Sequence, residues 1–413
     1  MKEFDLIVIG GGAAGFFSAV NVAAQNPAAR IAIVDRASKF LSKVKISGGG
    51  RCNVTHHCFD VQELIKFYPR GSKQLQQAFN RFQPKDTVEW FNKHGVKLVT
   101  ESDGRMFPST NSSQTIVDCL MDEAEKYGVR LMPGCGIRTV TKEGTRFLLH
   151  TDKEETLSSK NVLLACGGFP KKSQYDFIAS LNIAIVDPVP SLFTFIVKDK
   201  SLTELAGIAV PKATVKQAGS KKIYEGPLLI THHGLSGPAI LKTSAFAARE
   251  LFECNYAFTI LVNWIPQNNQ EQTLQELQQL KQKEGKKIIP NARLFSLPER
   301  LWLYFLEKAG IPFDTRWADV SNKQLNQLTN LISAFEVQVT SKNTFKDEFV
   351  TAGGVDLNEV DFTSMQSKKV GGLYFAGEVL DIDGVTGGFN FQAAWTTGWI
   401  AAQHIMTNIS HKS

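Results

Sequence analysis

The stretch Phe4-Asp5-Leu6-Ile7-Val8-Ile9-Gly10-Gly11-Gly12-Ala13-Ala14-Gly15 decides the fold of this 413-residue chain. Its apolar, β-branched first half predicts a buried parallel strand. Gly10 permits a tight turn, Gly12 lets the backbone approach a pyrophosphate, and Gly15 lets the next helix pack closely on the strand. The stretch therefore predicts a strand, a turn and a helix in succession, with the helix over about residues 13–25.

An acidic residue stands where this arrangement needs one to bind a nucleotide. Asp35 follows a second apolar run, Ile31–Val34. A carboxylate at this position accepts hydrogen bonds from ribose hydroxyls and repels a 2′-phosphate, while the helix N-terminus attracts the phosphates. The alternatives are a glycine-rich turn that binds nothing and a signal peptide. The signal peptide is not expected, because Glu3 and Asp5 replace basic residues. The sequence therefore predicts a dinucleotide site.

A second motif, near the other end of the chain, indicates which dinucleotide is bound. Gly372–Glu378 reads as an apolar strand tipped by an acid, and Gly387-Gly388 opens a loop before a helix predicted over about residues 391–406. Glu378 is placed to accept hydrogen bonds from the ribityl hydroxyls of a flavin, which NAD lacks. The helix N-terminus could direct N–H groups at the flavin pyrimidine carbonyl. Alone, Glu378 could be a solvated acid at a turn; together, the two motifs predict FAD.

Two further glycine-rich segments fit the same cofactor. Val162–Gly168 reads as a buried strand that ends in glycines, which allow a ligand to approach closely. Ser47–Asn53 is a glycine-rich loop just after Lys43 and Lys45, and such a loop can wrap around a cofactor. The alternative for this loop is a flexible turn. An Arg-Cys-Asn triplet embedded in the loop makes that alternative the less favoured one.

Four spaced motifs together resemble one known family: Lys45–Asn53, Gly104–Pro108, Thr231–Pro238 and Ala376–Asp381. Over essentially its whole length, the chain resembles a bacterial family of soluble FAD-dependent oxidoreductases with the glutathione-reductase-like fold. That family includes a reductase of ring double bonds in bile-acid breakdown and a dihydrouridine synthase acting on large-subunit ribosomal RNA. The resemblance implies reduction of a conjugated C=C bond with electrons from NAD(P)H.

The motifs and the resemblance together define the residues that we expect to bind FAD. At position 389 this chain has Phe where many relatives have Tyr, so a phenolic hydroxyl there is not expected to be an obligatory proton donor. The expected cofactor-binding residues lie in the motifs and beside them: Gly10, Gly12, Ala13, Ala14, Gly15, Asp35, Arg36, Lys43, Ser47, Gly50, Arg51, Cys52, Asn53, Ile137, Cys166, Gly167, Gly168, Gly377, Glu378, Asp381, Gly388, Asn390 and Phe391.

Cys52 is the first candidate for a catalytic side chain. Reduction of a C=C bond through a flavin needs a hydride from the flavin and a proton from the protein or water. The neighbouring Arg51 would lower the pKa of the Cys52 thiol and favour thiolate, which suits proton exchange near neutral pH. The alternative is a small buried packing residue, and this alternative is favoured because cysteine often has that role.

His232, His233 and Arg105 are the other catalytic candidates. Either histidine could donate a proton or bind a substrate carbonyl; the alternative is a hydrogen-bonded histidine that shapes a turn. Arg105 could bind an anionic or carbonyl group, with Phe107 stacking on a planar substrate. The alternative for Arg105 is a structural arginine that caps carbonyl groups.

The composition is that of an ordinary globular protein. Hydrophobic residues make up 43% and charged residues 21%, and no apolar run approaches the roughly 18 residues of a membrane span. The six cysteines show no CxxC and no metal-like spacing, which indicates a reducing cytoplasm, no metal site and no redox-active disulfide. The net charge of +6 permits an acidic partner such as RNA, although solvated lysines are the commoner explanation.

The predicted fold class is α/β: a Rossmann-like FAD-binding domain of the glutathione-reductase type, interrupted by an insertion. The FAD-binding domain is expected over residues 1–190 and 345–413. Residues 191–267 contain strand-like runs and predict a β-rich subdomain, and residues 268–344 have the composition and spacing of a small helical subdomain. The insertion is expected to form a wall facing the flavin ring, or else to stabilise or oligomerise the protein.

The sequence favours an enzyme that reduces an activated C=C bond with electrons from NAD(P)H. Since a second glycine fingerprint is absent, NAD(P)H is expected to dock transiently over the flavin. The substrate is a uracil in large-subunit ribosomal RNA or a small-molecule enone, and no membrane partner is expected. A flavin oxidase or monooxygenase and a non-catalytic redox sensor stay open, because one fold hosts many functions. The sequence indicates no oligomeric state.

Overall fold

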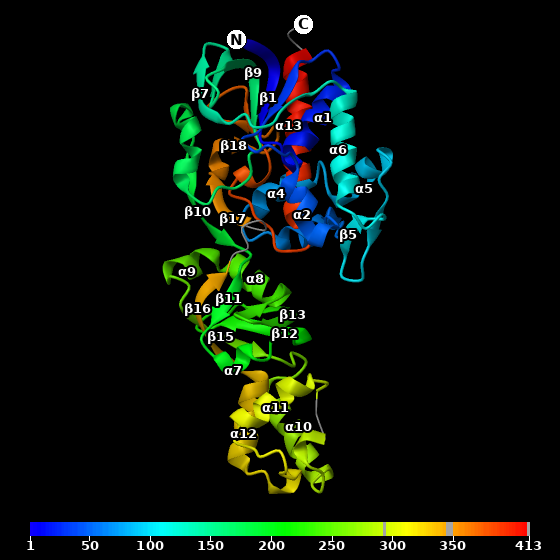
Figure 1. Ribbon diagram of the computed structural model, residues 1–413, viewed down its shortest axis with the longest axis vertical. Coiled ribbons are helices and arrows are strands. Elements are labelled where there is room, and N and C mark those ends of the chain that lie inside the picture. Colours follow the sequence, from blue (N-terminus) through cyan, green and yellow to red (C-terminus); the bar gives the residue numbers. More distant parts are fainter. Residues whose placement is uncertain (292–294, 344–349, 411–413) are drawn as a thin grey trace. The chain divides into compact units, whose positions relative to one another are not determined.

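The computed structural model describes residues 1–291, 295–343 and 350–410 (Figure 1). The chain divides into two compact units: unit 1 contains Met1–Ser191 and Lys346–Ser413, and unit 2 contains Leu192–Phe345. Unit 1 is therefore built from both ends of the chain, and unit 2 is a single insertion between them.

A largely parallel sheet forms the centre of unit 1. Its strand β1 (Lys2–Ile9) pairs in parallel with β2 (Ile31–Val34) and β9 (Thr156–Leu164), and β20 (Leu373–Phe375) pairs in parallel with β9. The central strands are buried, which explains their continuous apolar runs. Within the described residues the order is β18-β19-β20-β9-β1-β2-β6, and β7 joins the sheet through β8, which pairs with β9. The other strands are β6 (Arg130–Met132), β7 (Ile137–Glu143), β8 (Arg146–Thr151), β18 (Val360–Asp361) and β19 (Gln366–Ser367).

Two helices from opposite ends of the chain pack against each other beside this sheet (Figure 1). Helix α1 (Ala13–Gln25) has the predicted bounds, and α13 (Phe389–Ser410) begins two residues before the predicted start. The Ser18 hydroxyl donates to the Gly398 carbonyl oxygen (3.1 Å), and a Cβ on Gly398 would lie 2.9 Å from the Ser18 Oγ. The close approach of the two helices therefore requires glycine at position 398.

The remaining elements of unit 1 include two further small sheets. Strands β3, β5 and β4 form a small antiparallel sheet, and β10 pairs with β17. None of the helices in the described residues is long and apolar enough to cross a membrane. The bounds are α2 (Ser42–Gly50), β3 (Thr55–His56), α3 (Val61–Leu64), η1 (Ile65–Phe67), α4 (Ser72–Phe79), α5 (Pro84–Lys93), β4 (Leu98–Thr100), β5 (Arg105–Pro108), α6 (Gln114–Lys126), η2 (Lys172–Leu181), β10 (Ile185–Ser191), β17 (Val350–Val355), η5 (Leu357–Glu359) and η6 (Gly377–Val379), where η denotes a 3-10 helix.

Unit 2 contains a closed antiparallel barrel and a group of helices. In the described residues the barrel order is β11-β14-β13-β12-β15-β16. The barrel strands are β11 (Thr194–Val197), β12 (Ala209–Gln217), β13 (Tyr224–Thr231), β14 (Gly234–Ser236), β15 (Phe258–Asn263) and β16 (Phe335–Asn343). The helices are α7 (Lys200–Thr203), α8 (Pro238–Phe246), α9 (Ala248–Glu253), α10 (Gln270–Lys283), η3 (Ile289–Asn291), α11 (Glu299–Lys308), η4 (Trp317–Asp319) and α12 (Asn322–Ser333).

The predicted helical subdomain is wrong at its C-terminal end. Residues 335–343 form β16, which pairs with β11 and β15 and closes the barrel. One cluster of buried side chains runs from the barrel strands into α10, α11 and α12. The helices therefore share their hydrophobic core with the barrel. Helix α12, which leads directly into β16, contributes the buried side chains of Leu328 and Ile332 to this core.

We expect Leu328→Ala to destabilise the barrel as well as its own helix. Leu328 is completely buried in the shared core, and truncation of such a leucine costs about 2–5 kcal/mol of unfolding free energy. Amide hydrogen exchange should then show weaker protection in both α12 and β16. The control is Asn326→Ala, at an exposed position of the same helix. Loss of protection confined to α12 would mean that helix and barrel unfold separately.

Candidate functional site

The predicted strand, turn and helix form with their glycines in close contacts. Gly10 has a φ of +115°, which L side chains rarely adopt, and its N–H donates to the Val34 carbonyl oxygen (2.8 Å). A Cβ on Gly15 would overlap the Gly10 carbonyl oxygen, whereas a Cβ on Gly12 would meet no atom within 4 Å. Gly12 thus borders open space at the N-terminus of α1, where N–H groups attract phosphate.

The Asp35 carboxylate lies at the same turn. Its two oxygens accept hydrogen bonds from the N–H groups of Gly11 (2.7 Å) and Ala37 (2.8 Å). An ionised carboxylate offers about four acceptor positions, so both oxygens keep capacity for a ribose hydroxyl. The arrangement at the end of β2 is therefore able to bind the sugar of an adenosine.

Arg36 and Ile137 flank this acid. The N–H of Cys135 donates to the Asp35 carbonyl oxygen (2.7 Å), which brings the start of β7 beside the turn. Ile137, the first residue of β7, is buried, and Arg36 is exposed. Arg36 and Ile137 therefore belong to the two segments that this backbone hydrogen bond joins.

The C-terminal motif meets the N-terminal one in space. Gly377 begins η6 just after β20, and a Cβ on Gly377 would lie 2.9 Å from the Cβ of Ala14. The N–H of Gly377 also donates to the hydroxyl of Thr397 in α13 (2.9 Å). The first turn of α1, the short helix η6 and α13 are therefore in mutual contact.

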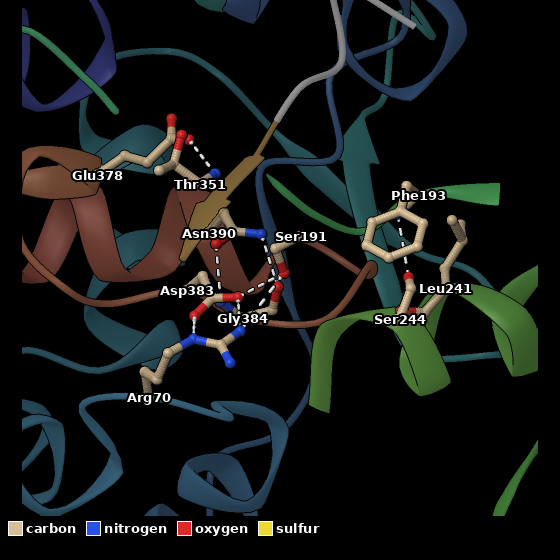
Figure 2. Close-up of polar contacts among 10 residues, drawn as sticks. All are labelled: Arg70, Ser191, Phe193, Leu241, Ser244, Thr351, Glu378, Asp383, Gly384 and Asn390. Carbon is tan, nitrogen blue, oxygen red and sulfur yellow. Dashed lines mark hydrogen bonds and ion pairs between the residues drawn. The ribbon is translucent and has the colours of Figure 1, made fainter. Parts of the chain in front are cut away.

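Glu378 lies at this meeting point with a side chain that is 19% exposed. Its Oε1 accepts a hydrogen bond from the Thr351 N–H (3.0 Å; Figure 2), and its Oε2 forms an ion pair with the Lys43 Nζ (3.0 Å). A Cβ on Gly168 would lie 2.9 Å from Glu378 Oε1. Two other expected cofactor residues, Lys43 and Gly168, thus lie beside the Glu378 carboxylate, which can accept further hydrogen bonds.

Cys166 lies within the influence of both acids. Burial raises the pKa of the Cys166 thiol to about 12, and the negative charges of Asp35 and Glu378 contribute in the same direction. Both carboxylates are therefore close enough to act on one thiol at the end of β9. Gly167 follows it with a φ of +76°. Asp35 and Glu378 thus both act on the residue that follows β9 by two positions.

The glycine-rich segment after Lys43 interrupts its helix. Ser47 has an extended ψ of 150°, and residues 48–50 have positive φ values, so the helical geometry of α2 ends there. The Asn53 side-chain amide lies between the Thr55 carbonyl oxygen and the Gly388 N–H, each at 3.0 Å. In the orientation that satisfies both groups it donates to the first and accepts from the second. This loop is thereby joined to the N-terminus of α13.

The loop before α13 is held by its own side chains. Asn390 donates from Nδ2 to the Gly384 carbonyl oxygen (2.9 Å) and accepts from the Gly384 N–H (2.8 Å), as Figure 2 shows. The N–H of Asp381 donates to the Val355 carbonyl oxygen (3.0 Å). Phe391 stacks on Trp395 with ring centroids 5.7 Å apart. The expected residues at 381, 390 and 391 therefore fix the direction in which α13 begins.

The comparison with known proteins agrees with this geometry. Residues 4–404 match the HI0933-like protein Rossmann domain. The chain belongs to this family.

Relatives of this family member extend over almost all of its length. A ribosomal RNA dihydrouridine synthase of Escherichia coli (strain K12) is 32% identical and covers 98% of this chain and 99% of the relative. A second one, from Haemophilus influenzae, is 30% identical over 97% and 98%. A 3-dehydro-bile acid delta(4,6)-reductase of Clostridium scindens is 25% identical over 96% and 97%. The family resemblance predicted from the four motifs is thus confirmed.

Solved structures share the fold at low sequence identity. A quinol fumarate reductase of E. coli is 12% identical with a TM-score of 0.51 and covers 100% of this chain and 72% of that one. A 3-ketosteroid delta1-dehydrogenase from Sterolibacterium denitrificans is 13% identical with a TM-score of 0.50, over 99% and 100%. This likeness concerns the fold, and with the family match it confirms the predicted α/β class with a Rossmann-type domain.

The expected effect of Arg51 on the Cys52 thiol is wrong. Cys52 is completely buried, and burial raises the pKa of its thiol to about 12, although a hydrogen bond with Ser47 opposes the shift. The Arg51 guanidinium instead forms an ion pair with Glu101 (2.6 Å). Desolvation therefore keeps the thiol protonated, which favours the packing interpretation of Cys52.

The expected stacking of Phe107 on a substrate is also wrong. The Phe107 ring is 1% exposed, and the Arg51 guanidinium lies 4.0 Å from its centroid. Arg105 binds Asp103 (2.7 Å) and Glu101 (2.9 Å) through its guanidinium. Both arginines thus share one carboxylate partner, and this geometry favours a structural role for Arg105 over substrate binding.

His232 and His233 lie in the turn between β13 and β14 of unit 2, where both are exposed. The Thr231 hydroxyl donates to the Gly234 carbonyl oxygen (3.1 Å) and accepts from the Gly234 N–H (3.1 Å). The N–H of Val197 donates to the His233 carbonyl oxygen (3.1 Å). The turn is therefore shaped by Thr231 and the backbone. A catalytic role for either imidazole stays a prediction.

Sequence reasoning missed His56. Its ring stacks on Phe389, the first residue of α13 (4.7 Å, 23°), and Phe389 in turn stacks on Phe67 (4.3 Å, 11°). Burial lowers the pKa of His56, so the imidazole is neutral near neutral pH. Its Nδ1 is buried and has no hydrogen-bond partner among the described residues. The position of His56, three residues after the glycine-rich loop, was the signal that could have identified it.

Taken together, these residues fit FAD. Open space borders Gly12 at one helix N-terminus, and a second helix N-terminus lies beyond Gly388. The two acids at positions 35 and 378 keep acceptor capacity for the hydroxyls of a ribose and a ribityl chain. These features match the phosphates and the two sugar-like parts of one cofactor molecule.

We expect Gly12→Ala to keep the fold and weaken FAD binding. Gly12 has extended backbone angles (φ −95°, ψ −168°) and room for a methyl group, so thermal unfolding of the apoprotein should be unchanged. The methyl group would occupy the space expected for the pyrophosphate, so a fluorescence titration should show an FAD Kd raised about tenfold or more.

Gly15→Ala is the matched comparison for this prediction. Its methyl group would overlap the Gly10 carbonyl oxygen, so the apoprotein itself should unfold at a lower temperature. If Gly12→Ala bound FAD with the affinity of the unmodified protein, the pyrophosphate would not approach the backbone at that residue.

Proposed function

We propose that this protein is an FAD-dependent oxidoreductase that reduces an activated C=C bond with electrons from NAD(P)H. The observation that carries the proposal is the contact between the Gly10–Gly15 turn and η6, which brings Glu378 to the nucleotide-binding edge of the sheet. The names of the relatives that match over nearly the full length, a ribosomal RNA dihydrouridine synthase and a bile acid reductase, support the same reaction class.

Each part of the site has a binding task in this proposal. Bound FAD would supply the hydride-transfer chemistry. Asp35 accepts hydrogen bonds from the ribose, and the N-terminus of α1 binds the pyrophosphate. Glu378 accepts hydrogen bonds from the ribityl chain. The N-terminus of α13 stabilises negative charge at the pyrimidine carbonyl.

The proton that accompanies the hydride comes from water or from a side chain other than Cys52. A thiol with a pKa of about 12 in a completely buried place is a poor partner for proton exchange near neutral pH. We therefore assign Cys52 to packing of the glycine-rich loop against its neighbours.

NAD(P)H docks over the flavin and leaves before the substrate binds. The sequence contains one strand-associated glycine fingerprint, at Gly10–Gly15, and α1 begins within it. In this proposal that fingerprint binds FAD, so it is not available to NAD(P)H. Reductant and substrate consequently use the same face in turn, which gives ping-pong kinetics. Steady-state rates at several fixed NAD(P)H concentrations test this directly, because a ternary complex produces intersecting double-reciprocal lines.

The favoured substrate is a uracil in large-subunit ribosomal RNA, which the enzyme reduces to dihydrouridine in the cytoplasm. Two relatives at 32% and 30% identity carry the name ribosomal RNA dihydrouridine synthase. The net charge of +6 is compatible with an RNA partner. A second candidate is a small-molecule enone, which the bile acid reductase at 25% identity favours.

We expect deletion of the gene to remove a dihydrouridine from large-subunit ribosomal RNA. Reverse-transcription mapping of dihydrouridine in the deletion strain measures this. A plasmid copy of the unmodified protein should restore the modification, and Gly12→Ala should restore it only weakly because FAD binding is impaired. Asn326→Ala is the control that should restore it fully.

An unchanged dihydrouridine pattern in the deletion strain would exclude the RNA substrate and leave the small-molecule enone. Anaerobic mixing of the holoenzyme with NADH and with NADPH then tests the wider proposal. If neither bleaches the flavin absorbance, the protein is not an NAD(P)H-dependent reductase.

We expect Cys52→Ala to keep the turnover number within about threefold of the unmodified enzyme, whereas loss of an acid–base catalyst costs about 10²–10⁴-fold. The variant should lose about 1–2 kcal/mol of unfolding free energy, because the smaller side chain leaves a cavity. Single-turnover reoxidation of the reduced enzyme by substrate, together with urea denaturation, measures both. A rate loss of about a hundredfold with unchanged stability would restore Cys52 as the proton donor.

A further inference from the structure

The loop that leads into α13 contacts one short segment of the chain, Phe67–Gly71, at successive points. The Val385 N–H donates to the Phe67 carbonyl oxygen (2.9 Å), and the Tyr68 hydroxyl donates to the Phe389 carbonyl oxygen (2.7 Å). The rings of Phe67 and Phe389 stack, with centroids 4.3 Å apart. This segment precedes α4 and includes none of the residues expected from the sequence to bind the cofactor, yet it supports the loop along its length.

A buried ion pair connects the segment to the loop. The Nε and Nη2 of Arg70 donate to the two carboxylate oxygens of Asp383, and the Ser191 hydroxyl donates to Asp383 Oδ2 (2.6 Å), as Figure 2 shows. The carboxyl side chain is 0% exposed and the Arg70 side chain 15% exposed. Three separate segments of unit 1 therefore meet at one carboxylate, with two-point geometry from the guanidinium.

The location of this pair indicates a role in geometry rather than in stability alone. Burial raises the pKa of Asp383, and Arg70 and Ser191 oppose that shift. Apolar residues in the place of a buried ion pair often stabilise a fold as well or better, so the pair needs another explanation. A bidentate pair fixes both direction and distance, and the next residue, Gly384, is held in turn by Asn390 in the first turn of α13.

We infer that Arg70 and Asp383 are positioning residues for the flavin-ring end of the FAD site. This inference rests on the proposed function. The ion pair fixes the side chain of Asp383 and with it the backbone that leads into Gly384. Gly384 is hydrogen-bonded to the side chain of Asn390 in the first turn of α13. The first N–H groups of α13 are thereby aimed at the place proposed for the pyrimidine carbonyl. Neither side chain is assigned to the nucleotide half of the site, which Asp35 and the Gly10–Gly15 turn form.

The decisive experiment compares FAD with ADP, which contains only the nucleotide half. We expect the Arg70→Gln/Asp383→Asn double variant to raise the FAD Kd about tenfold or more while the ADP Kd stays within about twofold. The double variant removes both charges and keeps hydrogen-bonding groups, so it does not leave one member of the ion pair charged opposite a neutral side chain. Isothermal titration of the apoprotein measures both constants.

Two further readouts separate positioning from general loss of structure. The visible circular dichroism and the midpoint potential of the bound flavin should change in the double variant, because both report the surroundings of the flavin ring. The single variant Arg70→Lys keeps the charge but loses the bidentate geometry. Its FAD Kd should therefore lie between those of the unmodified protein and the double variant. Glu359→Gln is the matched control: it breaks another ion pair in unit 1, that of Lys369 with a carboxyl side chain 8% exposed, and should leave both flavin readouts unchanged.

The outcomes distinguish this inference from the proposed function. If the unmodified protein binds no FAD, the proposed function and the positioning role are both refuted. If it binds FAD and the double variant does so with the same affinity, circular dichroism and potential, only the positioning role falls. If ADP and FAD are weakened equally, the pair supports the whole fold and the inference is likewise overturned.

Discussion

The parallel pairing of β1, β9 and β20 is the constraint on which the rest of the site depends. In this register Ile9 lies opposite Leu164, and Leu164 lies opposite Phe375. The three strands therefore end at one edge, and the segments that follow them, although far apart in sequence, meet there. A glycine is needed where backbone meets backbone: a Cβ on Gly10 would lie 2.3 Å from the Ala165 carbonyl oxygen. Without the shared edge, Asp35 and Glu378 would not lie close enough to bind one ligand.

Two groups of ion pairs in unit 1 differ in how exposed their cations are. Glu101 binds Arg51 and Arg105 and forms a local cluster beside a buried aromatic ring. Lys43, by contrast, reaches across to Glu378 from an exposed position. The Lys43 side chain is 54% exposed, against 31% for Arg51 and 39% for Arg105, so Lys43 exchanges its carboxylate partner more readily for water or a ligand. The arrangement keeps one acid responsive at the cofactor edge while the nearby arginines are engaged elsewhere.

The sequence predicted what is local and periodic, and it failed where long-range contacts decide. The strand, turn and helix at residues 4–25 follow from composition and glycine spacing, and the structure has them at almost the predicted bounds. Glu378 could be proposed because an acid ends an apolar strand. Thr351, Arg70 and Asp383 carry no such signal, since their partners lie on distant segments. The strand β16 was missed because its barrel partners β11 and β15 are also distant. The prediction of a lowered pKa for Cys52 was wrong for a related reason. The sequence shows the neighbouring charge of Arg51 but not the burial, which has the larger effect on the pKa.

The way in which the insertion joins the rest of the chain has a consequence for how such proteins diversify. On the unit 1 side, Ser191 pairs with Val350, and on the unit 2 side, Thr194 pairs with Asn343. The chain thus enters and leaves the insertion through strands that are paired with each other in both units. A segment whose ends emerge side by side can be exchanged for another without altering the strand order of its host. A chimaera that exchanges residues 192–345 as one module at these strands would therefore retain the parallel sheet of unit 1 and the edge at which β1, β9 and β20 end.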